Sequence, residues 1–170
     1  MLLVLQVATI FLVSIAWALA LSHALELPGK LRLSQEAYIA TQPIYYPGFT
    51  IGAGVGEAGG ILATAVLLLA TNRPSAEFTL TLVALVALLA MHAAYWIITH
   101  PVNKFWIRDQ NLTGLGAGFF GVGKRGRDTA TNANPNEVWR ALRNRWEYSH
   151  VLRAALAGMA LLCLIVAAAL

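Results

Sequence analysis

Residues 78–98 read FTLTLVALVALLAMHAAYWII, and this stretch contains no Asp, Glu, Lys or Arg. Because an α-helix rises 1.5 Å per residue, about 20 apolar residues cross the ~30 Å hydrocarbon core of a bilayer. Similar runs occur near both ends of the chain and once between them. The sequence predicts an all-α bundle of four transmembrane helices, at about 2–22, 51–71, 78–99 and 150–170. The first run exceeds the 7–15 apolar residues of a signal peptide and lacks its basic segment, so we expect a retained helix.

The overall composition supports a membrane location and a single domain, residues 1–170. Of the 170 residues, 58% are hydrophobic and 12% are charged, and the mean hydropathy is +0.64. Soluble domains contain about 25% charged residues. The uniform Leu, Ala and Val runs lack the alternation expected of a β-barrel. The only cysteine, Cys163, excludes an internal disulfide and a cysteine-based metal site.

Basic residues are distributed unevenly between the two sides of the predicted bundle. Of the 12 Lys and Arg residues, only Arg73 falls in the short connection between the second and third spans. The others lie in or beside the two long connections, and such an excess marks the cytoplasmic side. We therefore expect a multi-pass protein of the plasma (inner) membrane, with both long loops cytoplasmic and both termini outside. Because topology accounts for the net charge of +4, no nucleic-acid partner is predicted.

The second span carries small residues at every fourth position, namely Gly52, Gly56 and Gly60, followed by Thr64. This small-xxx-small pattern lets two membrane helices approach closely. The stripe is a candidate contact for a partner helix or for a second copy of the chain, and membrane lipid is the other expected partner. The same region fits G-x-G-x-x-G. That fingerprint requires a preceding strand in a βαβ unit, so we reject a dinucleotide site.

The last span is expected to follow directly from a short amphipathic helix that begins near Asn136 and continues to Arg153. Pro135 suits the first turn of such a helix. Trp139 and Trp146 are seven residues apart and therefore share one face. Tryptophan side chains at this level are typical anchors at the membrane interface.

Ionisable side chains gather at one end of the predicted bundle. His23 ends the first span, His100 ends the third, His150 begins the fourth, and Glu57 lies near the beginning of the second. With an even number of crossings, all four belong to the cytoplasmic end. Ionisable groups inside membranes are functional by default. Glu57 has no basic neighbour in the sequence, so it needs a partner from another helix, a proton or an aqueous cavity.

Two short motifs add carboxylates to this end, H-x-x-E at His23 and Glu26 and E-x-x-H at Glu147 and His150. Residues three apart share a helix face, and bundles that bind two metals use Glu-x-x-His motifs. The candidate ligands for iron, copper, manganese or zinc are His23, Glu26, Glu57, Glu147 and His150. Two alternatives remain open, a polar network that is structural or lines a substrate site, and a haem or quinone site. His92 lies deeper, where a buried, hydrogen-bonded histidine is expected.

Three motifs resemble those of the anthrone-oxygenase-like family of integral membrane proteins. They are His23-Ala24-Leu25-Glu26-Leu27-Pro28, His100-Pro101-Val102-Asn103, and the run from Asn136-Glu137-Val138-Trp139 through Arg145-Trp146-Glu147-Tyr148-Ser149-His150-Val151-Leu152-Arg153. The resemblance covers nearly the whole chain in layout and implies a four-helix membrane protein. Bacterial members are mostly described only as a domain of unknown function. Some members resemble enzymes that oxidise anthrones to anthraquinones with molecular oxygen and no known cofactor.

The resemblance implies a cofactor-independent oxygenase in which the enolate of a hydrophobic aromatic substrate, anthrone- or quinol-like, reduces oxygen. His150 is then expected to act as the general base and Arg153 to stabilise the enolate, with Trp146, His100 and Asn103 beside them. The aromatic residues expected to line a mouth near the cytoplasmic interface are Tyr45, Tyr46, Phe49, Trp106 and Trp146. Two other functions remain open. One is a redox subunit that binds a metal or haem through the His and Glu residues, and the other is a non-enzymatic accessory subunit.

Overall fold

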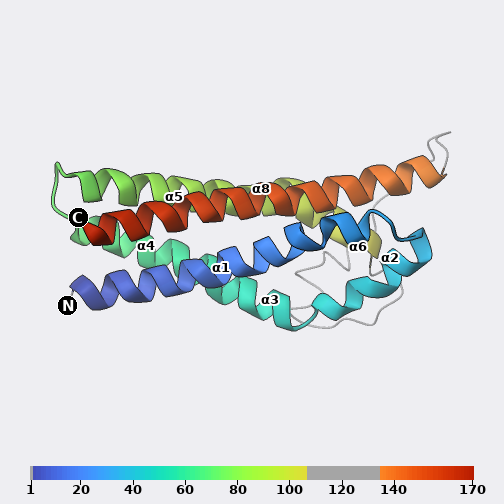
Figure 1. Cartoon of the computed structure of the whole chain (residues 1–170), viewed down its shortest axis with the longest axis horizontal. Coiled ribbons are helices and arrows are strands. Elements are labelled where there is room, and N and C mark those ends of the chain that lie inside the picture. Colours follow the sequence, from blue (N-terminus) through green and yellow to red (C-terminus); the bar gives the residue numbers. More distant parts are fainter. Residues whose placement is uncertain (1, 107–134) are drawn as a thin grey trace.

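The structure is a computed structural model that describes residues 2–106 and 135–170, and over these ranges the chain is helical without a β-strand. Four helical rods run alongside one another (Figure 1), each long and apolar enough to cross a membrane. The predicted four-helix fold is therefore confirmed. In chain order the elements are α1 (Leu2–Lys30), α2 (Gln35–Thr41), η1 (Gln42–Tyr45), α3 (Gly48–Ala53), η2 (Gly54–Ala58), α4 (Gly59–Ala70), α5 (Ala76–Ala94), η3 (Tyr95–Thr99), α6 (His100–Trp106) and α8 (Pro135–Ala169).

The helices continue beyond the apolar runs that reveal them in the sequence. α1 has 29 residues and α8 has 35. At 1.5 Å per residue these lengths are about 44 Å and 52 Å, well above the ~30 Å of hydrocarbon. Hydropathy marks only the lipid-facing part of a helix, so the predicted spans end before the helices do. The expected lead-in helix near Asn136 is present and is continuous with the last span.

Small and branched apolar side chains pack the interior of the membrane bundle. α8 packs along both α1 and α5, and α4 completes the bundle against α1. The buried members of this core are Val13, Leu67, Ala84, Ala87, Leu88, Ala160, Leu161 and Leu164. Large apolar side chains also cover the outside, as at Phe11, Leu62 and Leu69, which are mostly exposed. An extended apolar exterior of this kind suits contact with lipid.

The glycine stripe of the second span brings it against α1 of the same chain. A Cβ atom added at Gly56 would lie 2.7 Å from the backbone nitrogen of Ala16, and one at Gly60 would lie 3.1 Å from the Val13 side chain. At Gly52 the added atom would meet Leu19 at 2.8 Å. The predicted close approach of two helices is therefore present. The expectation that this stripe contacts another chain is corrected, because α1 already covers it.

A second core, rich in aromatic rings, lies at the end of the bundle opposite the two termini (Figure 1). Residues from α2, η1, α6 and the first turns of α8 build it. Its buried members are Tyr38, Tyr45, Val102, Trp106, Trp139 and Trp146. Ser34 fixes the start of α2, because its hydroxyl accepts a hydrogen bond from the backbone N–H of Ala37 at 3.2 Å. The polar side chains of the candidate site lie between this aromatic core and the apolar core of the membrane bundle.

Candidate functional site

Two of the membrane helices are locally widened into π-helical turns, η2 (Gly54–Ala58) and η3 (Tyr95–Thr99). Such turns are rare and are frequently found at functional sites, because the extra residue changes the direction in which side chains project. η2 presents Glu57, and η3 presents Tyr95 and Thr99. These three side chains line one cavity, so both π-helical turns contribute residues to the same site.

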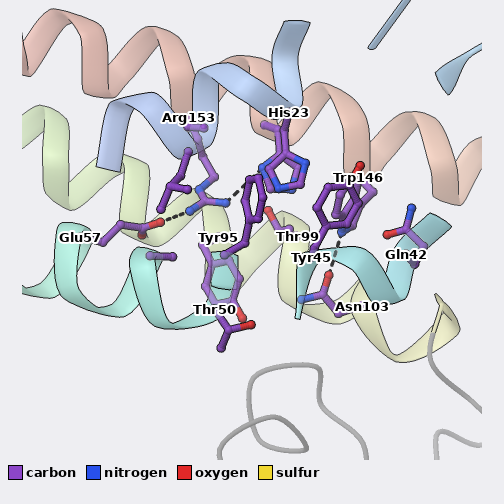
Figure 2. A pocket seen from close by; sticks show the side chains of 15 residues that line it. His23, Gln42, Tyr45, Thr50, Glu57, Tyr95, Thr99, Asn103, Trp146 and Arg153 are labelled. Atoms are coloured by element: carbon purple, nitrogen blue, oxygen red, sulfur yellow. Dashed lines mark hydrogen bonds and ion pairs between the residues drawn. The ribbon is translucent and has the colours of Figure 1, made fainter. Parts of the chain in front are cut away.

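The cavity has a volume of about 50 Å³ and is lined by residues of α1, η1, α3, η2, η3, α6 and α8 (Figure 2). Aromatic rings supply much of its wall, and polar side chains from several helices project between them. Its lining residues are Leu19, Ala20, His23, Gln42, Tyr45, Phe49, Thr50, Ala53, Glu57, Tyr95, Thr99, Asn103, Trp146, His150 and Arg153. Aromatic surface combined with a few convergent polar groups is typical of a small-molecule site.

Arg153 lies at the centre of the polar groups and is buried. Its Nη2 atom donates to Oε1 of Glu57, and its Nη1 atom lies 3.3 Å from Nδ1 of His150. The guanidinium carbon is also 5.3 Å from the centre of the Tyr95 ring. A charge inside a membrane bundle requires such compensation. The partner that the sequence required for Glu57 is thus Arg153, which is far away in the chain.

The second oxygen of Glu57 faces His92, whose Nδ1 atom is 3.4 Å from Oε2. On the other side of this imidazole, the Trp96 indole N–H donates to Nε2 at 2.9 Å. Because an indole can only donate, Nε2 must accept, and the neutral ring carries its hydrogen on Nδ1. His92 therefore donates to the carboxylate. The expectation of a buried His92 was wrong, since 41% of its side chain is exposed and both nitrogens are satisfied at the bundle surface.

The imidazole rings of His23 and His150 pack against each other in the cavity wall, with ring centres 4.2 Å apart. Arg153 can only donate to Nδ1 of His150, so the hydrogen of the neutral imidazole sits on Nε2. That Nε2 atom is buried without a hydrogen-bond partner among the described residues. Lys30 constrains His23 in the same way, with Nζ 3.3 Å from Nδ1. Both imidazoles therefore present donors rather than acceptors.

A second polar cluster surrounds the buried amine of Lys30, between the cavity and the aromatic core. Its Nζ atom lies 2.8 Å from Oε2 of Glu26 and 3.6 Å from Oε1 of Glu147. Tyr38 donates to Glu147 at 2.8 Å, and Tyr45 donates to Glu26 at 2.7 Å.

Neither phenol of this second cluster ionises easily. Burial, followed by the charge of Glu147, raises the pKa of Tyr38 above its usual range. Burial, followed by the hydrogen bond to Glu26, raises the pKa of Tyr45. Both hydroxyl groups consequently remain protonated hydrogen-bond donors at neutral pH.

The five candidate metal ligands are divided between these two clusters. Glu57 is bound to Arg153, whereas Glu26 and Glu147 are bound to Lys30. Within residues 2–106 and 135–170, no three His, Cys, Asp or Glu side chains are arranged to hold a metal ion. Metal binding by this set stays a prediction, and it would require these ion pairs to separate.

The residues implied by the resemblance are mostly brought together. The Trp146 indole donates to Oδ1 of Asn103 at 2.7 Å (Figure 2), and both side chains line the cavity beside His150 and Arg153. His100 does not line it; its ring packs 4.9 Å from the Trp96 ring.

The aromatic residues expected at a mouth are only partly brought together at the cavity. Tyr45, Phe49 and Trp146 line the cavity, whereas Tyr46 and Trp106 do not. Trp106 instead belongs to the aromatic core.

Four cavity residues with polar groups were not predicted from the sequence, namely Gln42, Thr50, Tyr95 and Thr99. A signal for two of them exists, because Tyr95, Thr99 and Asn103 follow one another at intervals of four. Residues four apart share one face of a helix, so this polar ladder points to a common interior surface. Gln42 and Thr50 lie in a connecting segment and at the start of a helix, where no periodic pattern marks them.

Several lining side chains keep a polar atom that has no hydrogen-bond partner among the described residues. These buried atoms are Nε2 of Gln42, Oγ1 of Thr50, Nε2 of His150 and Nε of Arg153. Buried polar groups in native proteins are nearly always satisfied, by the protein or by water or a ligand. Three of these four atoms carry N–H hydrogens, and the hydroxyl can also donate. An acceptor oxygen that reached these atoms, whether from water or from a ligand, would satisfy them.

No family model, curated protein or solved structure matches the chain.

Proposed function

We propose that this membrane protein binds a lipophilic aromatic molecule through its oxygen atoms and oxidises it with molecular oxygen, without a bound cofactor. The observation that carries the proposal is the set of unpartnered donors on Gln42, Thr50, His150 and Arg153 around an aromatic-lined cavity. Anthrones and quinols have the matching chemistry, because they combine fused or single aromatic rings with carbonyl or hydroxyl oxygens. The motif resemblance at Trp146, His150 and Arg153 supports the same class of substrate.

The depth of the cavity favours a substrate that arrives through the bilayer. Arg153 lies roughly 24 Å along α8 from Ala169, and Glu57 lies roughly 20 Å along its span from Ala70. If the far end of each helix marks one edge of the ~30 Å hydrocarbon core, both side chains lie within that core. The excess of basic residues at this end supports a position toward the cytoplasmic leaflet, with both termini outside.

The donor set suits a reaction in which negative charge develops on oxygen. Removal of a proton from the carbon opposite an anthrone carbonyl leaves an enolate, which Arg153 and His150 stabilise by donating hydrogen bonds. The enolate supplies the electrons that reduce oxygen. One anthrone and one O₂ then give one anthraquinone and one water. The substrate is the reductant, so this balance requires no electron donor from the protein.

A cavity of about 50 Å³ accommodates a few water molecules but not a polycyclic ligand. We therefore expect the cavity to widen on binding, so that the carbonyl oxygen of the substrate reaches the donors and the carbon opposite that oxygen also enters. The rings of the substrate then lie against Phe49 and Tyr45, with some displacement of these side chains. Displacing loosely held water from aromatic surface also favours binding.

The test is oxygen uptake and anthraquinone formation from anthrone by the protein in lipid nanodiscs, corrected for the spontaneous reaction. We expect equal amounts of oxygen consumed and quinone formed. The variant Arg153→Lys keeps a positive charge beside Glu57 but loses the donor aimed at His150. It should lower turnover by about 100-fold, whereas Arg140→Lys, an exposed change in α8, should have no effect.

Three results would contradict this function. The first is quinone formation no faster than in empty nanodiscs. The second is unchanged turnover in Arg153→Lys. The third is activity that appears only after iron or copper is added, since this would favour a metal-dependent redox protein instead.

A further inference from the structure

We propose that Glu57 is the general base that removes the proton from the carbon acid bound in the cavity. This inference rests on the function proposed above, and it assigns the base to a residue that the motif resemblance does not include. It is argued from the hydrogen bonds around the cavity, which determine which side chains can accept a proton there.

The two histidines on the cavity wall are poorly arranged to accept a proton. Arg153 donates to Nδ1 of His150, and the ring hydrogen then occupies Nε2. Lys30 imposes the same arrangement on His23. In each ring one nitrogen accepts from a cation and the other carries hydrogen, so neither offers a free lone pair. His150 is better suited to donate to the substrate oxygen than to act as the base.

Glu57 is the carboxylate among the residues that line the cavity. The other two carboxylates nearby, Glu26 and Glu147, are bound to Lys30 and do not line it. The π-turn η2 carries Glu57 toward Arg153 and the cavity (Figure 2). Carboxylates serve as bases toward carbon acids when nearby donors stabilise the enolate oxygen.

Arg153 allows this proton transfer without creating an unbalanced charge in the membrane. Before the transfer, its guanidinium is paired with the Glu57 carboxylate. The C–H bond of the substrate breaks, the proton forms an O–H bond on Glu57, and the electron pair remains on the substrate as an enolate. The negative charge has then moved from Glu57 to the substrate oxygen, and the same guanidinium serves as its counter-ion. In a low-dielectric site this conservation of charge avoids a large desolvation cost.

His92 and Trp96 act as positioning residues for this base. The indole of Trp96 fixes the tautomer of His92, whose Nδ1–H then points at the carboxylate. With Arg153 on the other oxygen, the orientation of Glu57 is set from two sides. Displacement of a catalytic group by about 1 Å can reduce a rate by about 100-fold, so this support is expected to influence proton transfer.

The experiment measures proton removal separately from oxidation. Wild-type protein in nanodiscs is mixed with anthrone under anaerobic conditions in D₂O, and deuterium uptake at the methylene carbon is followed by mass spectrometry. We expect the protein to accelerate this exchange above the spontaneous rate. Glu57→Gln should abolish at least 99% of the acceleration, because general-base catalysis contributes about 100-fold or more. Anthrone binding, measured in parallel by equilibrium dialysis, should remain.

Two further variants distinguish the loss of a catalytic base from a folding defect. Glu57→Asp keeps the charge beside Arg153 and withdraws the carboxylate by about one methylene, so exchange should fall at least about tenfold while binding persists. Glu137→Gln, an exposed change near the start of α8, is the control and should exchange like wild type.

The outcomes separate this inference from the proposed function. Wild-type exchange that persists undiminished in both Glu57 variants overturns the role of Glu57 but leaves the proposed function standing. Anthrone binding by wild type without accelerated exchange also overturns it. Failure of wild type to bind anthrone at all removes both.

Discussion

Replacing Gly56 with Ala tests whether the contact between η2 and α1 is as close as the structure indicates. The added Cβ atom would lie 2.7 Å from the backbone nitrogen of Ala16 and 3.1 Å from its Cα. Backbone atoms cannot rotate away, so the two helices must separate by about 0.7 Å to restore an ordinary contact of 3.4 Å. Overpacking of this kind costs about 1–3 kcal/mol. The better helix propensity of Ala offsets at most about 1 kcal/mol of this.

The matched control is two residues away in the same π-turn. A Cβ atom at Gly54 meets nothing within 4 Å, so Gly54→Ala receives the gain in helix propensity without the clash. We expect Gly54→Ala to raise the free energy of unfolding by up to about 1 kcal/mol, and Gly56→Ala to lower it by about 1–2 kcal/mol. The difference is measured by denaturant-induced unfolding in detergent micelles. Equal effects of the two substitutions would refute the close approach of η2 and α1.

The same pair of variants also reports on the cavity. Glu57 directly follows Gly56, so separating η2 from α1 moves the carboxylate relative to Arg153. We therefore expect Gly56→Ala to weaken ligand binding as well as stability, whereas Gly54→Ala should leave binding unchanged. Stability lost without any change in binding would indicate that the carboxylate keeps its place when the helices separate.

Two further predictions concern the buried polar groups. Glu57→Gln and Arg153→Gln should each lower the free energy of unfolding by about 3–5 kcal/mol, because each leaves a buried charge unpaired. The double variant should lose much less stability than the sum of the two single variants. Additive losses in denaturant titrations would contradict the ion pair. Because burial and then the charge of Glu147 raise the pKa of Tyr38, the folded state retains a proton that the unfolded state loses above about pH 10. Stability should therefore decline as the pH rises beyond that value, and Tyr38→Phe should make this decline shallower in thermal unfolding scans.

The fold could be predicted from the sequence because lipid imposes a simple rule on it. A span must be apolar, helical and about 20 residues long, and the run FTLTLVALVALLAMHAAYWII satisfies all three conditions. The helix that packs against the glycine stripe could not be predicted from the sequence. Gly52, Gly56 and Gly60 show that a helix approaches closely, but their spacing does not say whether that helix belongs to the same chain. The structure identifies it as α1.

The gathering of polar groups at one end of the bundle was also predictable, whereas their pairing was not. Counting an even number of crossings places His23, Glu57 and His150 at the same end. Which side chains touch depends on helix rotation, and two π-turns alter that rotation within the spans. The sequence therefore indicated that Glu57 needs a partner but could not select Arg153. The exposure of the His92 side chain could not be predicted for the same reason, since a small rotation of the helix decides whether a residue faces the core or the lipid.

Stability alone gives no reason for the features that meet at this cavity. A buried ion pair such as Arg153–Glu57 is often no more stable than well-packed apolar residues of similar size, because both charges lose their hydration. Two π-turns interrupt regular hydrogen bonding at the same level, and lining side chains keep buried polar atoms without partners among the described residues. Each of these features is unfavourable by itself, and departures from local rules are expected where a protein has a functional site. Their coincidence around one aromatic-lined cavity is best explained by a ligand that satisfies the donors and uses the charge of Arg153.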